Sequence, residues 1–162
     1  MKVTAVVPVY NEEKTIGNIL KVLTSHNVVD DTIVVDDGSI DNTPNILKKF
    51  KSAKLKIIKL KKNSGKGNAV KVATKSIKSG IILFIDADLR NLKKDHIDKI
   101  LKPVIDRDSM MVIGLMDKGN FIANMIMPYF PLTGGQRAIL TSVFMEIRKI
   151  PLIKGWGLES VM

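Results

Sequence analysis

The chain has 162 residues, of which 45% are hydrophobic, and its formal net charge is +10. A chain of this length is typical of one domain that buries about two-thirds of its unfolded surface, so we expect a single domain over residues 1–162. It contains no cysteine, which excludes disulfides and thiolate metal sites and leads us to expect a cytoplasmic protein.

The apolar residues do not predict a targeting or membrane-spanning segment. The run Val3–Val9 is short and leads into charged residues, unlike a signal peptide. A transmembrane helix needs roughly 20 apolar residues in succession. The nearest approach, residues 121–132, is interrupted by Asn124, Pro128 and Pro131, so we expect a core or surface segment there.

Alternating strand and helix patterns through the first two-thirds of the chain predict an α/β fold with a mostly parallel sheet flanked by helices. We expect strands at residues 3–9, 32–36, 56–60, 81–85 and 110–114, and helices at residues 12–23, 44–50, 66–78 and 95–105. Thr43 followed by Pro44 is typical of a helix start, in which the hydroxyl caps the first turn. Past residue 114 the pattern loosens, and we expect a short helix from about Thr141.

Polar residues stand at the ends of three predicted strands. These motifs are Pro8-Val9-Tyr10-Asn11-Glu12, Asp36-Asp37-Gly38-Ser39 and Asp86-Ala87-Asp88. The carboxyl ends of parallel strands meet at the edge where open α/β sheets bind ligands. Carboxylates concentrated there would repel one another and any anionic ligand unless a divalent cation or ligand hydrogen-bond donors neutralise them. The pattern therefore favours a cation that bridges to a phosphate.

In this order and at these separations, the three motifs resemble the nucleotide-sugar half of a family 2 glycosyltransferase with the GT-A fold. The resemblance extends from about residue 3 to residue 90, and polyprenyl-phosphate sugar synthases such as dolichyl-phosphate mannose synthase belong to that group. It implies an open, mostly parallel GT-A sheet. It also implies a metal-dependent hexosyltransferase that moves a sugar from a UDP- or GDP-linked donor to an acceptor such as a polyprenyl phosphate.

The motifs have two other interpretations. A nucleotidyltransferase can share the fold but normally carries a glycine-rich, Arg-containing loop after the first strand, and the segment after Pro8 is not such a loop. The chain also looks short at its acceptor side, because residues 157–162 resemble the start of a helix. The second alternative is therefore a nucleotide-sugar-binding module with little or no transfer activity.

The resemblance implies roles for individual residues. Asp86 and Asp88 would hold Mg²⁺ or Mn²⁺ against the donor diphosphate, with Asp88 as the direct ligand and Asp86 contacting the ribose or a metal-bound water. Asp37 would accept a hydrogen bond from the base, with Asp36 supporting it, and Lys66 in a Gly-Lys-Gly stretch would lie near the nucleotide. The remaining donor-binding residues would be Pro8, Asn11, Glu12, Ala87 and Tyr10, whose ring would stack on the base.

Each motif also has a purely structural interpretation. Asn11 would cap the helix expected to begin at Glu12. Residues 36–39 form a common turn sequence, residues 63–68 would be a plain turn before a helix, and residues 86–88 would be a turn and helix cap.

The last part of the chain would form the acceptor side. The paired Gly134 and Gly135 would let the backbone approach a ligand, or would form a turn. Arg137 would bind an anionic acceptor or the leaving diphosphate through its planar guanidinium, or would lie in a surface salt bridge. Glu159 lies in a stretch that also resembles glucosyl-3-phosphoglycerate synthases. It would deprotonate a hydroxyl acceptor, or would be structural if the acceptor is a lipid phosphate.

The charge is unevenly distributed, with twelve lysines and no Asp or Glu between residues 42 and 85. One predicted helix carries Lys71, Lys75 and Lys78 on a single face. This face would be solvated or would bind anionic lipid headgroups, which would place the protein at the inner face of the membrane. No nucleic-acid-binding module is recognisable, so nucleic acid is not an expected partner. We expect His26 and His96 to be ordinary surface residues.

Overall fold

The computed structural model describes residues 1–114 and 136–149 of the chain. The strands are β1 (Val3–Val9), β2 (Asp31–Asp36), β3 (Leu55–Lys59), β4 (Ile81–Phe84), β5 (Met111–Gly114) and β6 (Gln136–Leu140). They form one sheet in the order β3-β2-β1-β4-β6-β5. β3, β2, β1 and β4 are parallel, and β6 is antiparallel to both β4 and β5.

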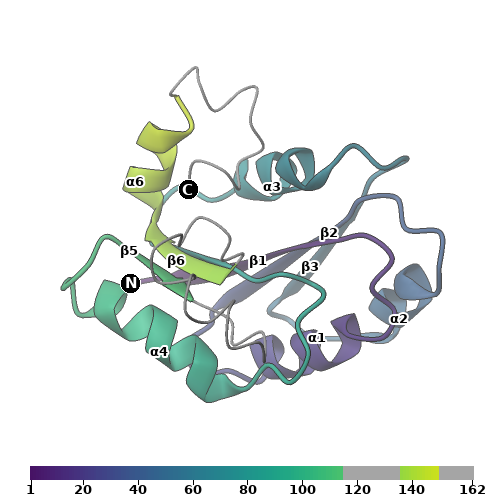
Figure 1. Ribbon diagram of the computed structural model, residues 1–162, viewed down its shortest axis with the longest axis horizontal. Helices are drawn as coiled ribbons and strands as arrows, with labels where there is room; N and C mark the ends of the chain where they lie inside the picture. The colour runs from purple at the N-terminus through teal and green to yellow at the C-terminus, as the bar shows by residue number, and fades with distance from the viewer. Residues whose placement is uncertain (115–135, 150–162) are drawn as a thin grey trace, which may run out of the picture.

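Helices cover both faces of this sheet (Figure 1). They are α1 (Ile16–Thr24), α2 (Thr43–Lys49), α3 (Lys66–Thr74), α4 (Lys94–Ile105) and α6 (Thr141–Ile147). Helices α1, α2 and α4 pack on one face, where their apolar side chains join one core cluster. On the opposite face, α3 and α6 form a second cluster, in which the rings of Phe84 and Phe144 lie 5.5 Å apart. The sheet is therefore the middle layer of three.

The sequence of β1 explains its central position. All of its side chains are buried except that of Pro8, which is partly buried. Neighbouring side chains point to opposite faces, so Val7 joins the cluster under α1 while Val6 joins the cluster under α3. Strands covered on both faces read as continuous apolar runs, as this one does.

The predicted α/β fold is confirmed, but several element ends differ from prediction. Each predicted strand lies within one residue of its observed bounds. α1 begins at Ile16 rather than at Glu12, and the amide of Glu12 donates to the hydroxyl of Thr43. α3 ends at Thr74 rather than at Lys78, and residues 75 and 76 follow as a turn.

The sequence did not predict β6. Its first two residues, Gln136 and Arg137, are 9% and 3% exposed, so the strand lacks the alternation of apolar and polar side chains that marks a half-buried strand. The short helix expected near Thr141 is confirmed as α6, which follows β6 directly.

One of the two histidines was predicted wrongly. His26 is only 3% exposed, because it packs where the end of α1 meets α4. Its Nδ1 accepts the amide of Val28 at 3.2 Å, and its Nε2 lies 3.3 Å from Oδ1 of Asp98. His96 is exposed on α4, as expected.

Candidate active site

The polar strand ends meet at the carboxyl edge of the sheet, as predicted, because β2 and β4 are the two neighbours of β1. Val9 is the register partner of Asp36, and the amide of Asp37 donates to the carbonyl of Val9 at 2.8 Å. On the other side, the amide of Ile85 donates to the carbonyl of Val6 at 3.0 Å, which brings the Asp86-Ala87-Asp88 motif beside the same edge.

The loops after β1 and β2 are joined by short polar side chains. Asn11 has a left-handed backbone with φ 55°, its amide donates to Ser39 Oγ at 3.0 Å, and its Oδ1 accepts the amide of Ile40 at 2.9 Å. Thr43 Oγ1 accepts the amide of Glu12 at 2.9 Å. Both predicted helix caps are therefore wrong. Asn11 does not cap α1 and Thr43 does not cap α2, whose N-cap is Asn42, because both side chains bind the neighbouring loop instead.

Asp37 anchors the loop that leads into α3. It is 3% exposed, its Oδ1 accepts the amide and hydroxyl of Ser64 at 3.0 and 2.9 Å, and its Oδ2 accepts the amide of Gly65 at 2.8 Å. Gly38 allows this approach, since a Cβ there would lie 2.7 Å from the backbone carbon of Lys62. Ser64 was missed by sequence reasoning, because nothing local links it to Asp37.

Asp36 supports the turn after β2. It is 1% exposed, and its Oδ1 accepts the amide of Ser39 at 2.9 Å. Its Oδ2 is buried and has no hydrogen-bond partner among the residues that the structure describes. Asp36 therefore holds the backbone that follows β2 at the carboxyl edge of the sheet.

The carboxylate of Asp86 is paired with a lysine from another element. Nζ of Lys66, the first residue of α3, lies 2.7 Å from Asp86 Oδ1, and the two side chains are 39% and 21% exposed. Both residues were predicted site residues, but the pair itself was not foreseen. Asp88, the other member of the predicted metal pair, is exposed.

Thr15 joins the first motif to the third. Its hydroxyl donates to the carbonyl of Ala87 at 2.6 Å and lies 3.1 Å from Oε2 of Glu12. Ala87 itself is buried. Sequence reasoning missed Thr15, because it stands outside every motif.

The carboxylate oxygens at the carboxyl edge are suited to a hard cation that is held by the protein together with a ligand. Within residues 1–114 and 136–149, no group of three or more His, Cys, Asp or Glu side chains could hold a metal. Mg²⁺ commonly uses one or two carboxylates and takes its other ligands from water and phosphate. Asp86 and Asp88 supply that many, and Asp86 already binds a cationic group. These residues fit Mg²⁺ or Mn²⁺ bound together with a diphosphate.

A cavity of about 200 Å³ at the carboxyl edge is lined in part by Lys66, the ion-pair partner of Asp86. Ligand pockets commonly measure about 300–1,000 Å³, so the cavity matches part of a nucleotide rather than all of it. Tyr10 is 40% exposed at this edge, which leaves its ring accessible for stacking. The lining residues are Pro8, Val9, Tyr10, Asp37, Asn63, Gly65, Lys66 and Ala69.

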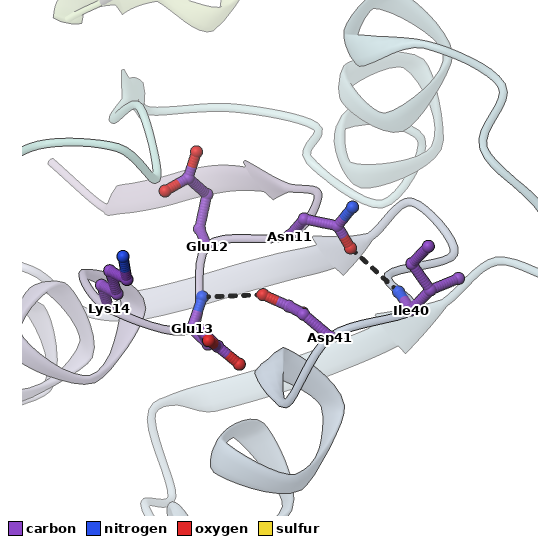
Figure 2. A pocket seen from close by; sticks show the side chains of 6 residues that line it. All are labelled: Asn11, Glu12, Glu13, Lys14, Ile40 and Asp41. Atoms are coloured by element: carbon purple, nitrogen blue, oxygen red, sulfur yellow. Dashed lines mark hydrogen bonds between the residues drawn. The ribbon is translucent and has the colours of Figure 1, made fainter.

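A second cavity, of about 550 Å³, opens where the loops after β1 and β2 meet (Figure 2). Asp41 lies in its wall and accepts the amides of Thr43 and Glu13 at 2.9 and 3.2 Å. Burial alone raises the pKa of Asp41, but the hydrogen bonds from Thr43 and Glu13 outweigh it and hold the pKa of that carboxyl below its usual range. The side chain of Glu12 points away from Asp41 in this view.

The predicted acceptor-side residues divide into two groups. Arg137 lies in β6 opposite Phe84 and Ile113 and is 3% exposed, so it does not lie at the surface, where the salt-bridge alternative placed it. Gly134, Gly135 and Glu159 lie outside the described residues.

The lysine-rich segment presents its charges to solvent. On and after α3, Lys71, Lys75 and Lys78 are exposed, whereas Val70, Ala73 and Ile77 are buried, which confirms the predicted two-faced pattern. No helix among the described residues is long and apolar enough to cross a membrane.

Fold and strand ends together define an α/β domain with acidic motifs at the carboxyl edge of its sheet, and comparison with known proteins gives its family. The chain belongs to glycosyl transferase family 2, whose model matches residues 4–149. The open, mostly parallel sheet with helices on both faces is the GT-A fold. The predicted family and fold are thus confirmed.

One similar protein is the UDP-N-acetylglucosamine–dolichyl-phosphate N-acetylglucosaminyltransferase of Methanococcus voltae. It is 33% identical over 126 residues, which cover 67% of this chain and 49% of that protein. The chain spans about half the length of the curated relatives it matches.

Two solved structures share the fold. The mannosyltransferase PcManGT of Pyrobaculum calidifontis, in complex with GDP-Man and Mn²⁺, has a TM-score of 0.71 and 21% identity, over 90% of this chain and 46% of that one. The glucosyl-3-phosphoglycerate synthase of Mycobacterium tuberculosis, with Mn²⁺, UDP-glucose and phosphoglyceric acid, has a TM-score of 0.68 and 20% identity, over 88% of this chain and 57% of that one.

Proposed function

We propose that this chain carries the donor site of a metal-dependent glycosyltransferase, which moves a sugar from a UDP- or GDP-linked donor to an acceptor. The observation that carries the proposal is that Asp37 and Lys66 line one cavity at the carboxyl edge of the sheet, and that Lys66 is paired with Asp86. Mn²⁺ and a nucleotide sugar are present together in two structures with the same fold, which supports the choice of ligand.

The cavity beside Tyr10 would hold the base. An ionised carboxylate has about four lone-pair sites. Three hydrogen bonds from Ser64 and Gly65 already engage Asp37, so one site stays available for a base N–H. Tyr10 would stack on the base, and Pro8, Asn11 and Glu12 would line the path toward the ribose.

The diphosphate would lie between Lys66 and the two aspartates. Asp88, which is exposed, would be the direct ligand of Mg²⁺ or Mn²⁺, and Asp86 would contact the ribose or a metal-bound water. When bound, the cation would neutralise the charge that develops on the departing diphosphate. The ammonium of Lys66 would add a second positive charge on the same side, and Ala87 would bring its backbone close to the donor.

For the acceptor we favour a polyprenyl phosphate at a membrane surface. The Methanococcus voltae relative is named for transfer to dolichyl phosphate. The exposed Lys71, Lys75 and Lys78 would attract anionic headgroups. A phosphate acceptor is already ionised and needs no base, whereas a hydroxyl acceptor would require one, for which Glu159 is the proposed residue. Gly134, Gly135 and Arg137 complete the proposed acceptor side.

Calorimetry tests the donor site. We expect UDP or GDP to bind with Mn²⁺ and to bind far more weakly without it, because unneutralised carboxylates repel the diphosphate. Asp88→Asn should weaken nucleotide binding at least tenfold, a change of about 1.4 kcal/mol. Asp108→Asn, which removes an exposed carboxylate elsewhere, is the matched control and should bind like the parent.

Equal affinity of the parent and Asp88→Asn would contradict the metal assignment. A second assay supplies the nucleotide sugar with and without a polyprenyl phosphate. Formation of a glycosyl phosphate supports a transferase with a lipid acceptor, whereas binding with no product supports a binding module.

A further inference from the structure

Lys66 already places a positive charge at the carboxylate we assign to the metal site. Its Nζ lies 2.7 Å from Oδ1 of Asp86, which is an ion-pair distance. The two residues come from different elements, since Lys66 begins α3 and Asp86 follows β4. Their meeting therefore depends on the tertiary fold and not on neighbouring positions in the chain.

The loop before Lys66 is held in place independently of this pair. Asp37 accepts hydrogen bonds from the amides of Ser64 and Gly65, the residues immediately before it. The Lys66 side chain is 39% exposed, and its ammonium stands at the end of a flexible stem of four carbons. The ammonium can therefore leave Asp86 without movement of the loop. Partly exposed ion pairs are also weak enough to be exchanged for stronger partners.

We propose that Lys66 acts as the counter-ion of Asp86 before nucleotide binds and moves to the donor diphosphate when nucleotide and metal bind together. This inference rests on the proposed function, because it takes the donor diphosphate and the divalent cation as the ligands of the site. Lys66 lines the cavity proposed for the nucleotide. Rotation of its side chain is therefore enough to carry the ammonium from Asp86 to the diphosphate.

Charge explains why the exchange requires both ligands. A divalent cation that arrives alone must compete with the Lys66 ammonium for the Asp86 carboxylate, and the positive charge of the ammonium repels it. A nucleotide diphosphate brings enough negative charge for both cations, and its oxygens are good partners for each. Metal and nucleotide should therefore bind cooperatively, and by linkage each should increase the affinity of the other by the same factor.

The test measures Mn²⁺ binding to the protein by the electron paramagnetic resonance signal of free Mn²⁺, with and without UDP or GDP. We expect Lys66→Met, which keeps an apolar stem and removes the charge, to bind Mn²⁺ alone at least threefold more tightly than the parent. The factor by which nucleotide tightens Mn²⁺ binding should fall in the same variant. Lys66→Gln should behave like Lys66→Met.

Lys71→Met is the matched control. It removes the same charge from the same helix, at an exposed position that forms no ion pair with a carboxylate of the described residues. It should leave Mn²⁺ affinity within twofold of the parent. An equal gain in both variants would assign the effect to general charge and overturn the proposal. So would an unchanged or weakened affinity in Lys66→Met.

The two hypotheses fail in different ways. If neither the parent nor Lys66→Met binds Mn²⁺ in the presence of either nucleotide, the proposed function is wrong and this inference falls with it. If the parent binds Mn²⁺ with nucleotide but Lys66→Met gains nothing with Mn²⁺ alone, only the counter-ion role is wrong.

Discussion

Two aspartates near the cavity differ because their surroundings differ. Asp37 is almost fully buried, and a buried charge requires fixed hydrogen-bond partners, which the amides of Ser64 and Gly65 provide. Asp86 is partly exposed, and its partner is a lysine side chain that can rotate away. Asp37 is therefore suited to holding a loop in place, whereas Asp86 is suited to exchanging one cationic partner for another.

Asp41 makes stability depend on pH. Its pKa is below the unfolded value of about 3.9, so its contribution is complete above about pH 4 and is lost as the pH falls through the lower folded value. Asp41→Asn should therefore lower the melting temperature by about 1–3 °C at neutral pH, as expected for loss of charge-assisted hydrogen bonds.

Thermal unfolding of the parent and of Asp41→Asn across the acid range checks this. The difference in melting temperature should shrink as the pH falls below about 4. A difference that stays the same at every pH would show that the Asp41 charge contributes nothing to stability.

At the scale of elements, the site is an assembly of loops fixed to one another. The loop between β3 and α3 passes so close to the turn after β2 that a Cβ at Gly38 would lie 2.7 Å from the Lys62 backbone. Gly38 also has a φ of 76°, in the left-handed region. Gly65 has a similar φ of 89°, but no atom lies within 4 Å of a Cβ placed there.

These two glycines separate packing from backbone strain. Gly38→Ala and Gly65→Ala should both lose stability because alanine is strained at positive φ. Gly38→Ala should lose about 1–3 kcal/mol more, because its methyl group also meets the backbone of the neighbouring loop. Denaturant unfolding of the two variants measures the difference, and equal losses would mean that this loop contact does not constrain the site.

The elements that the sequence predicted correctly are those with a local signal. β1, β2 and β4 are apolar runs that lead into acidic residues, and both features are visible within a few positions. β6 was missed because Gln136 and Arg137 are polar yet buried. Their burial results from the position of β6 between β4 and β5, which the sequence does not reveal. Contacts such as Thr15 with Ala87 depend in the same way on β4 lying beside β1.

At the scale of the molecule, the acidic motifs and most of the lysine-rich segment lie on different parts of the fold. The acidic motifs gather at the carboxyl edge of the sheet, while exposed lysines occupy α3 and the edge strand β3, where Lys56 and Lys59 are exposed. Lysines on an edge strand discourage pairing with another chain, which gives β3 a structural reason for its composition. The net charge of +10 therefore coexists with a local group of carboxylates at that edge.

The central claim is that a nucleotide diphosphate and a divalent cation bind together at the carboxyl ends of β1, β2 and β4. A crystal structure of the protein with Mn²⁺ and UDP or GDP tests it most directly, because Mn²⁺ gives an anomalous signal. We expect an anomalous peak in coordination contact with Asp88 and the diphosphate, the base beside Tyr10, and the Lys66 ammonium displaced from Asp86 toward phosphate oxygen. A nucleotide bound at another edge of the sheet, or a Mn²⁺ peak away from both aspartates, would contradict the account.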